Sequence, residues 1–176
     1  GIRDLASSLV GSEMCIRDSM RAWYDIVQIS ASRGQDEAGI ALSAQQVQAL
    51  IGREIERGIP ASRIILAGFS QGGAMALHVG LRYPQKLAGI MALSGYLLFP
   101  ERLMQERSEA NAATPVFIGH GTMDPMVPFA LGQATVTALE AGQWPVEWHS
   151  YPIPHSVSPP EIADVGNWLN GRLNGQ

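Results

Sequence analysis

The sequence is poor in cysteine, in long apolar runs and in basic charge. Its single cysteine, Cys15, cannot form an intramolecular disulfide, so nothing in the sequence requires an oxidising compartment and we expect a cytoplasmic protein. No apolar run approaches the roughly 20 residues that a helix needs to cross a bilayer, so the chain is not expected to span a membrane. The 12 basic and 16 acidic residues give a net charge of −4, which argues against a nucleic-acid partner.

What is present is the composition of one ordinary domain. A chain of 176 residues with 46% apolar content can bury a substantial core. Its beginning differs in character, because it opens with Gly1 and lacks the pattern of a signal peptide. We assign residues 1–19 no role: Ser7–Ser19 (SSLVGSEMCIRDS) resembles a translated sequencing-adaptor scar, and a disordered tail is the alternative. Residues 20–176 are expected to form a single, partial domain.

Short apolar runs alternate with amphipathic segments along the rest of the chain. Ser43 and Gln46 match a capping box, which predicts a helix from Ser43 to about Arg57. Pro160 suits the first turn of a final helix. Between them we expect strand Ile64–Ala67, turn Gly68–Gly73, a helix from Ala74 that Pro84 ends, strands Leu87–Leu93 and Val116–Ile118, helix Phe129–Ala141 and strand Val146–Tyr151. This alternation predicts an α/β fold, with a mostly parallel sheet and helices on both faces.

The turn after the first predicted strand carries the first sign of chemistry. Its residues Gly68-Phe69-Ser70-Gln71-Gly72 fit the G-x-S-x-G pattern, which holds a serine hydroxyl on a sharp turn between a strand and a helix. We expect Gly68 and Gly72 to be glycine because a Cβ at either position would clash where the two backbones pass. The pattern is short, so an ordinary glycine-rich turn is the alternative. The buried strand before it and the helix after it favour a nucleophilic Ser70.

A serine hydroxyl needs a base within hydrogen-bond reach and a carboxylate to orient that base. In α/β-hydrolases the acid follows the nucleophile along the chain and lies at the carboxyl end of a later strand. Asp124 follows the strand Val116–Ile118 and should therefore lie at the same edge of the sheet as Ser70. The alternative is a simple turn aspartate before Pro125.

Four histidines compete for the role of base. His155 lies in the loop after the last predicted strand, where the chain order of the α/β-hydrolases places the base. His78 falls in the helix after Ser70, His120 precedes the acid, and His149 falls inside a strand, so a structural role is expected for all three. An imidazole whose ordinary pKa is about 6.5 can exchange a proton with Ser70 near neutral pH.

Several segments in unbroken order resemble the carboxylesterase, phospholipase and acyl-protein thioesterase family of α/β-hydrolases. They are WYDI at Trp23–Ile26, ASRIILAGFSQGGAMAL at Ala61–Leu77, HGTMDPMVP at His120–Pro128 and YPIPH at Tyr151–His155. The resemblance implies the α/β-hydrolase fold, a triad of Ser70, Asp124 and His155, and substrates that are short or medium acyl esters, lysophospholipids or acyl thioesters. It implies no metal and no organic cofactor, and it suggests a homodimer.

One feature of the family has no counterpart here. Family members resemble one another in an earlier strand that ends in an HGLG-like loop, and the only His-Gly pair in this sequence is His120-Gly121. The family's oxyanion hole takes one backbone N–H from the residue after the nucleophile, here Gln71, and the second from that earlier loop. Loss of one such donor typically lowers the rate by on the order of 10² to 10³. Because the earlier strand and its loop have no counterpart here, the fold is expected to lack its N-terminal strands.

Two further interpretations stay open at this point. Leu97 and Phe99, with Met123 and Met126 near the acid, are candidates for an apolar acyl site, and core packing or a dimer contact explains them equally well. The leading function is hydrolysis through an acyl-Ser70 intermediate. The alternatives are a non-catalytic or catalytically impaired α/β module and a hydrolase that uses only a Ser-Asp dyad.

The absence of earlier strands generates a prediction for the chain as written. Without them Ile64–Ala67 is an unpaired apolar edge, which is an aggregation hazard. We expect the chain to be poorly soluble, as measured by the fraction left in the supernatant after ultracentrifugation, and nearly inactive. Good solubility together with a Ser70-dependent rate close to that of a full-length relative would contradict this expectation.

Overall fold

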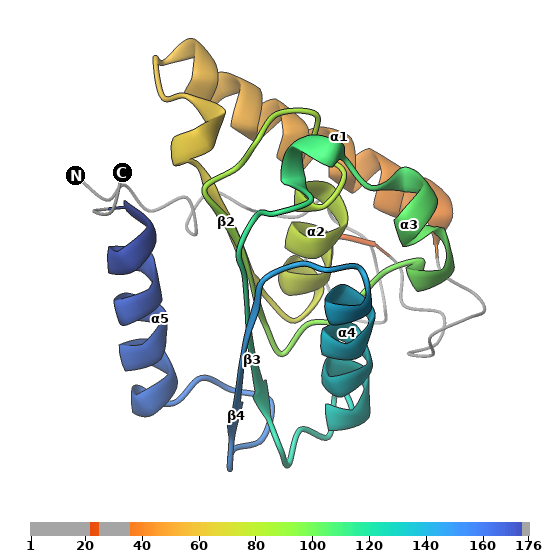
Figure 1. The fold of residues 1–176 in the computed structure, drawn as a ribbon. Helices are drawn as coiled ribbons and strands as arrows, with labels where there is room; N and C mark the ends of the chain where they lie inside the picture. The colour runs from red at the N-terminus through yellow and green to blue at the C-terminus, as the bar shows by residue number, and fades with distance from the viewer. Residues whose placement is uncertain (1–21, 25–35, 174–176) are drawn as a thin grey trace.

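A computed structural model describes residues 22–24 and 36–173 (Figure 1). The predictions for residues 1–19, the boundary at residue 20 and the end of the WYDI segment lie outside these residues. The helices are α1 (Glu37–Glu56), α2 (Gln71–Gly80), α3 (Leu103–Glu106), α4 (Phe129–Ala141) and α5 (Pro159–Leu173), and the strands are β1 (Ile65–Phe69), β2 (Gly89–Leu93), β3 (Val116–Gly121) and β4 (Val146–Tyr151). Three short 3-10 turns, Ala61–Arg63, Pro100–Arg102 and Glu109–Asn111, complete the described elements.

The strands form one parallel sheet in the order β1-β2-β3-β4. In its register Phe69 pairs with Leu93, and Leu93 with Gly119, so the carboxyl ends of the strands lie at one edge. Segments that follow neighbouring strands therefore meet at that edge, although they are far apart in the sequence. The α/β class and the parallel sheet predicted from the sequence are confirmed.

Helices cover both faces of the sheet, as the sequence predicted. In Figure 1 α5 lies on one side of the sheet, and α1, α2 and α4 lie on the other. The larger core cluster is on the side of α1, α2 and α4 and includes Ile40, Leu77, Ile118 and Leu139. The smaller cluster is built from Met91, Phe117 and Trp168 of α5. Burial of both apolar faces favours β-branched and apolar side chains along β2 and β3.

Helix α1 differs from the prediction at its start. The helix begins six residues before Ser43, because the carboxylate of Asp36 accepts a hydrogen bond from the N–H of Gly39 at 2.9 Å and so caps the helix. Ser43 is buried inside α1, and its hydroxyl donates a hydrogen bond to the carbonyl of Trp23. The capping box predicted at Ser43 is therefore wrong, whereas the bounds predicted for α4 and β4 are confirmed.

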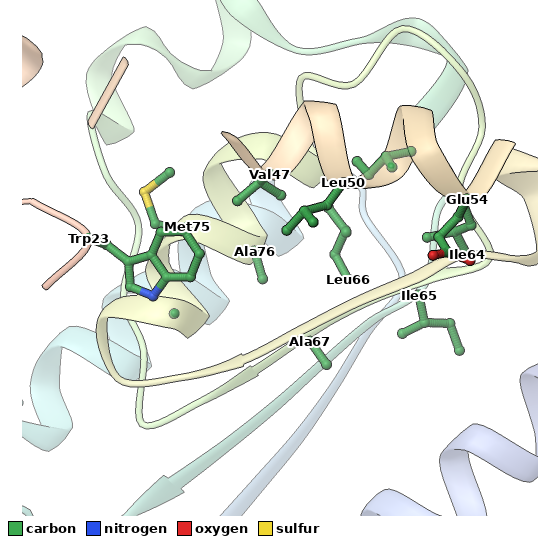
Figure 2. Close-up of a pocket in the computed structure, with 12 residues that line it drawn as sticks. Trp23, Val47, Leu50, Glu54, Ile64, Ile65, Leu66, Ala67, Met75 and Ala76 are labelled. Atoms are coloured by element: carbon green, nitrogen blue, oxygen red, sulfur yellow. The ribbon is translucent and has the colours of Figure 1, made fainter. Parts of the chain in front are cut away.

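Strand β1 lies at one edge of the four strands that the structure describes, as the sequence predicted for this segment. An apolar groove runs along it, with walls formed by α1, α2 and Trp23 (Figure 2). Its lining includes Trp23, Val47, Leu50, Ile64, Leu66 and Met75, and among the described lining residues only Glu54 is charged. The groove ends near Gly72, in the first turn of α2.

A wholly buried asparagine connects the loop before β2 with the loop before β3. The Asn111 side chain accepts hydrogen bonds from the N–H of Leu87 at 2.9 Å and the hydroxyl of Thr114 at 2.8 Å. Its amide donates to the carbonyls of Tyr83 at 2.7 Å and Gln85 at 2.9 Å. One side chain makes all four hydrogen bonds, so Asn111 fixes the positions at which the chain enters β2 and β3.

We predict that Asn111→Ala destabilises the fold by roughly 3–5 kcal/mol, because it leaves several buried backbone groups without partners. Urea denaturation of the variant and of the unsubstituted chain measures this difference. Asn170→Ala, at an exposed position of α5, is the matched control and should change stability by less than about 0.5 kcal/mol. Equal stability of the two variants would contradict the role assigned to Asn111.

Candidate active site

Ser70 occupies the sharp turn between β1 and α2 in a backbone conformation that L-residues rarely adopt. Its φ is 56° and its ψ is −121°. The surrounding backbone holds it there, since the N–H of Ser70 donates to the carbonyl of Leu93 at 2.8 Å and the N–H of Ala74 donates to the carbonyl of Ser70 at 3.0 Å. Strained residues of this kind cluster at functional sites, where the surrounding structure over-determines them.

The two glycines of the motif are not equivalent. A Cβ on Gly68 would collide with the backbone of Gly72 and would lie 2.6 Å from the nitrogen of Gly73, so close approach of β1 and α2 requires glycine here. Among the described residues, a Cβ on Gly72 would meet only the indole nitrogen of Trp23, at an ordinary 3.6 Å. The steric prediction is therefore confirmed for Gly68 and wrong for Gly72, because the helix backbone turns the Cβ direction of residue 72 away from the strand.

His155 lies in the loop between β4 and α5, with its Nε2 3.0 Å from the hydroxyl oxygen of Ser70. Its ring packs against Phe69, with 4.7 Å between the ring centroids, and its side chain is 17% exposed. The packing limits the rotation of the imidazole and leaves one edge open to solvent. This role of Phe69 could not be predicted from the sequence, because residue 69 occupies a variable position of the G-x-S-x-G pattern.

Asp124 holds the other side of the imidazole. Its Oδ2 lies 2.6 Å from Nδ1 of His155, and its Oδ1 accepts hydrogen bonds from the N–H groups of Met126 at 2.8 Å and Val127 at 2.9 Å. The structure thus combines both readings of Asp124: one oxygen closes a turn and the other contacts the histidine. Burial opposes ionisation of the carboxyl, but the bonds from His155, Val127 and Met126 outweigh it and hold the pKa of Asp124 below its usual range.

The hydrogen bonds determine which ring nitrogen of His155 carries the hydrogen. An ionised carboxylate can only accept, so Nδ1 of His155 carries a hydrogen and the lone pair of Nε2 faces the Ser70 hydroxyl. That arrangement can remove a proton from Ser70 when its oxygen attacks an electrophile. The structure therefore brings together Ser70, His155 and Asp124, the three residues that the sequence singled out.

The loops that carry the acid and the base are bonded to each other. Thr122 donates from its N–H to the carbonyl of Tyr151 at 2.7 Å, and Met123 donates to Ile153 at 3.2 Å. Gly121 permits this approach, because a Cβ there would lie 2.6 Å from the carbonyl oxygen of Pro154. The sequence analysis missed this role of Gly121, although the glycine directly before the acid's loop was the available signal.

Helix α5 starts directly after the loop of His155 with a capping box that the sequence analysis also missed. The N–H of Glu161 donates to the hydroxyl of Ser158, and the N–H of Ser158 donates to the carboxylate of Glu161, both at 3.4 Å. Glu161 is almost fully buried, and this burial raises the pKa of its carboxyl. The capping box fixes the end of the loop that positions His155.

Gln71 was predicted to supply a backbone N–H to the reacting carbonyl. It opens α2 directly after Ser70, where the first N–H groups of a helix have no carbonyl partner within the helix. Its side chain has a second role, since it accepts from the N–H of Trp23 at 3.2 Å and donates to the carbonyl of Tyr24 at 3.0 Å. Gln71 thereby holds the segment of Trp23 and Tyr24 beside the turn of Ser70.

The residues proposed for an acyl site differ strongly in their exposure. Leu97 and Phe99 are buried in the larger core cluster, at 6% and 9% exposure, whereas Met123 and Met126 are 61% and 59% exposed. Core packing therefore accounts for the first pair. The apolar acyl site suggested from the sequence therefore stays a prediction.

The other histidines lie where the sequence placed them, away from the nucleophile's hydrogen bond. His78 belongs to α2, and burial together with the charge of Arg82 lowers its pKa to about 4. His149 belongs to β4 and lies 3.0 Å from Glu147 and 3.5 Å from Asp164. Within residues 22–24 and 36–173, no cluster of His, Cys, Asp or Glu is arranged to bind a metal ion, and no helix is long and apolar enough to cross a bilayer.

The asymmetry of the two motif glycines can be tested directly. We predict that Gly68→Ala slows the reaction of Ser70 with an organophosphonate by on the order of 10² or more, because β1 and α2 must separate and displace the hydroxyl. Gly72→Ala is the matched control and should react within about threefold of the unsubstituted chain. Intact-mass spectrometry over time measures both rates. Equal losses in the two variants would contradict the steric account.

Comparisons with known proteins show which family the chain belongs to. The family model described as phospholipase/carboxylesterase matches residues 9–172, a range that begins inside the segment 1–19 whose origin stays a prediction. Acyl-protein thioesterase 1 of Neurospora crassa is 43% identical over 88% of this chain and 66% of its own length. Acyl-protein thioesterase 1 of Yarrowia lipolytica is 37% identical over 88% of the chain and 70% of its own. The chain thus spans about two thirds of these curated relatives.

The fold is also that of known esterases. The crystal structure of Arabidopsis thaliana SOBER1 superposes with a TM-score of 0.82 at 32% identity, over 89% of this chain and 76% of that one. Zea mays acyl-protein thioesterase 2 gives a TM-score of 0.77 at 28% identity, over 88% and 74%. The match across nearly the whole chain confirms the resemblance and the α/β-hydrolase fold predicted from the sequence: the chain belongs to the phospholipase/carboxylesterase family.

Proposed function

We propose that this chain hydrolyses carboxylic esters or thioesters through an acyl-Ser70 intermediate. The observation that carries the proposal is the continuous hydrogen-bonded series from Ser70 through His155 to Asp124, with distances of 3.0 and 2.6 Å. A serine hydroxyl with a base on one side, and a carboxylate on the far side of that base, is an arrangement suited to acyl transfer.

In the first half of the reaction Nε2 of His155 takes the proton from Ser70 as the serine oxygen attacks the carbonyl carbon. The carboxylate of Asp124 stabilises the imidazolium that forms, and the backbone N–H of Gln71 donates to the developing oxyanion. His155 then passes the proton to the departing alcohol or thiol, and the acyl group stays on Ser70. The proton therefore moves from Ser70 to His155 and from His155 to the leaving group.

In the second half water replaces the leaving group. His155 removes a proton from the water, whose oxygen attacks the acyl carbon. As the bond between that carbon and the Ser70 oxygen breaks, His155 returns the proton to Ser70, and a carboxylic acid is released. The pKa of Asp124, which is held below its usual range, keeps this carboxyl ionised at neutral pH. Asp124 therefore neither gains nor loses a proton in either half of the cycle.

The proposed substrates are short or medium acyl esters, lysophospholipids or acyl thioesters. The relatives named acyl-protein thioesterase 1 support the inclusion of thioesters. A cytoplasmic location, a small-molecule or lipid ester as the partner, and assembly as a homodimer are part of the same proposal. The Ser-Asp dyad is a weaker alternative, because Nε2 of His155 already lies within hydrogen-bond reach of Ser70.

We predict that an organophosphonate labels Ser70, and that Ser70→Ala abolishes both the labelling and the low rate of p-nitrophenyl butyrate hydrolysis that is expected of the unsubstituted chain. The reason is that no other group can form the acyl intermediate in this mechanism. Peptide mapping by mass spectrometry locates the label, and absorbance follows the hydrolysis. His155→Ala should lower the rate by several orders of magnitude, which also decides against the dyad.

Ser62→Ala serves as the control, because Ser62 is exposed in the 3-10 turn before β1, at the opposite end of that strand from Ser70. It should leave labelling and hydrolysis unchanged. Hydrolysis that persists in Ser70→Ala, or a label on another residue, would overturn the proposed function.

A further inference from the structure

His120 is a fully buried histidine for which the proposed mechanism has no direct use. It is the second-last residue of β3 and has 0% exposure. Its ring packs among aromatic side chains, with ring-centroid distances of 5.9 Å to Phe129 and 6.4 Å to Trp148. An apolar side chain of similar size would fill this space at a lower cost, because burial of a polar ring without full hydrogen bonding is unfavourable.

The two ring nitrogens of His120 have different surroundings. Nε2 lies 3.0 Å from the carbonyl oxygen of Val127, and because that oxygen can only accept, Nε2 carries a hydrogen and donates it. Nδ1 is buried and has no hydrogen-bond partner among the described residues. One ring nitrogen therefore has no hydrogen-bond partner among the described residues, while the other holds the carbonyl of Val127 in the loop that carries Asp124.

Val127 is also hydrogen-bonded directly to Asp124. The N–H of Val127 donates to Oδ1 of Asp124 at 2.9 Å, while the carbonyl of the same residue accepts from His120. Nε2 of His120 also lies 3.7 Å from Oδ2 of Asp124, which is too far for a hydrogen bond. Residue 127 is therefore anchored on both sides, between His120 and the acid.

We propose that His120 is a positioning residue that acts through Asp124. By fixing Val127, it fixes the N–H that holds Oδ1 and thereby aims Oδ2 at Nδ1 of His155. The inference rests on the proposed function and extends it to a residue that touches neither the substrate nor the nucleophile. Small displacements of such groups can lower a rate by orders of magnitude, since the chemistry depends on alignment of the reacting groups.

The test compares three substitutions of His120 with the unsubstituted chain. His120→Phe keeps a planar ring but has no donor, and His120→Asn has an amide too short to reach the Nε2 position. His120→Gln carries an amide N–H that can reach the carbonyl of Val127. We expect kcat for p-nitrophenyl butyrate to fall on the order of 10- to 100-fold in the first two variants, with KM within about twofold, and to stay within about threefold in His120→Gln.

A double-mutant cycle with Asp124→Asn separates positioning from general structural damage. If His120 acts through the acid, His120→Phe should lower kcat by less than about twofold when Asp124→Asn is already present, whereas independent damage would multiply the two losses. His120→Asn replaces His120→Phe in the cycle if the latter does not fold, as judged by thermal unfolding.

The outcomes distinguish this inference from the proposed function. Full kcat in folded His120→Phe or His120→Asn, no recovery in folded His120→Gln, or multiplicative losses in the cycle would overturn the positioning role while Ser70→Ala still abolished hydrolysis. Hydrolysis that survives Ser70→Ala would instead overturn the function itself.

Discussion

The hydrogen bond between Asp124 and His155 is the interaction on which the rest of the site depends. It is short, at 2.6 Å, and it joins a carboxylate on the loop after β3 to an imidazole on the loop after β4. The parallel sheet makes the bond possible, because all strands end at one edge and Ser70 leaves β1 at that same edge. Three segments separated along the chain are thereby brought within one hydrogen-bonded series.

Strain and burial at this edge are offset by backbone hydrogen bonds. The conformation of Ser70, with φ of 56°, costs on the order of 1–3 kcal/mol, and bonds to Leu93 and from Ala74 hold it in place. The buried carboxylate of Asp124 would be costly alone, but the N–H groups of Met126 and Val127 satisfy one of its oxygens. The apolar core below the edge supplies the rigidity that keeps these groups aligned.

The sequence could predict those features that arise from local pattern. Alternating apolar runs indicate the strands and helices, and the spacing of Ser70, Asp124 and His155 indicates where each leaves the sheet. The start of α1 could not be found in this way, because Ser43 with Gln46 offers a capping pattern in the middle of the helix and Asp36 provides the actual cap. Local sequence contained both signals, and only the tertiary packing of Ser43 against Trp23 decides between them.

Features that depend on contacts between distant segments were beyond the sequence. Gly68 differs from Gly72 because a Cβ on Gly68 would meet the backbone of α2, whereas a Cβ on Gly72 would meet the side chain of Trp23. The burial of Leu97 and Phe99, and the exposure of Met123 and Met126, follow from how loops fold over the sheet. The roles of Phe69, Gly121 and the side chain of Gln71 likewise arise from contacts with segments far away along the chain.

Asp124 fixes the orientation of His155 so that Nε2 offers its lone pair to Ser70. The most direct measurement is nitrogen-15 NMR of the His155 ring at about pH 8, in the unsubstituted chain and in Asp124→Asn. The account predicts that in the unsubstituted chain the hydrogen is on Nδ1, with a strongly downfield proton resonance that disappears in the variant. A hydrogen on Nε2, or a spectrum that Asp124→Asn leaves unchanged, would contradict it.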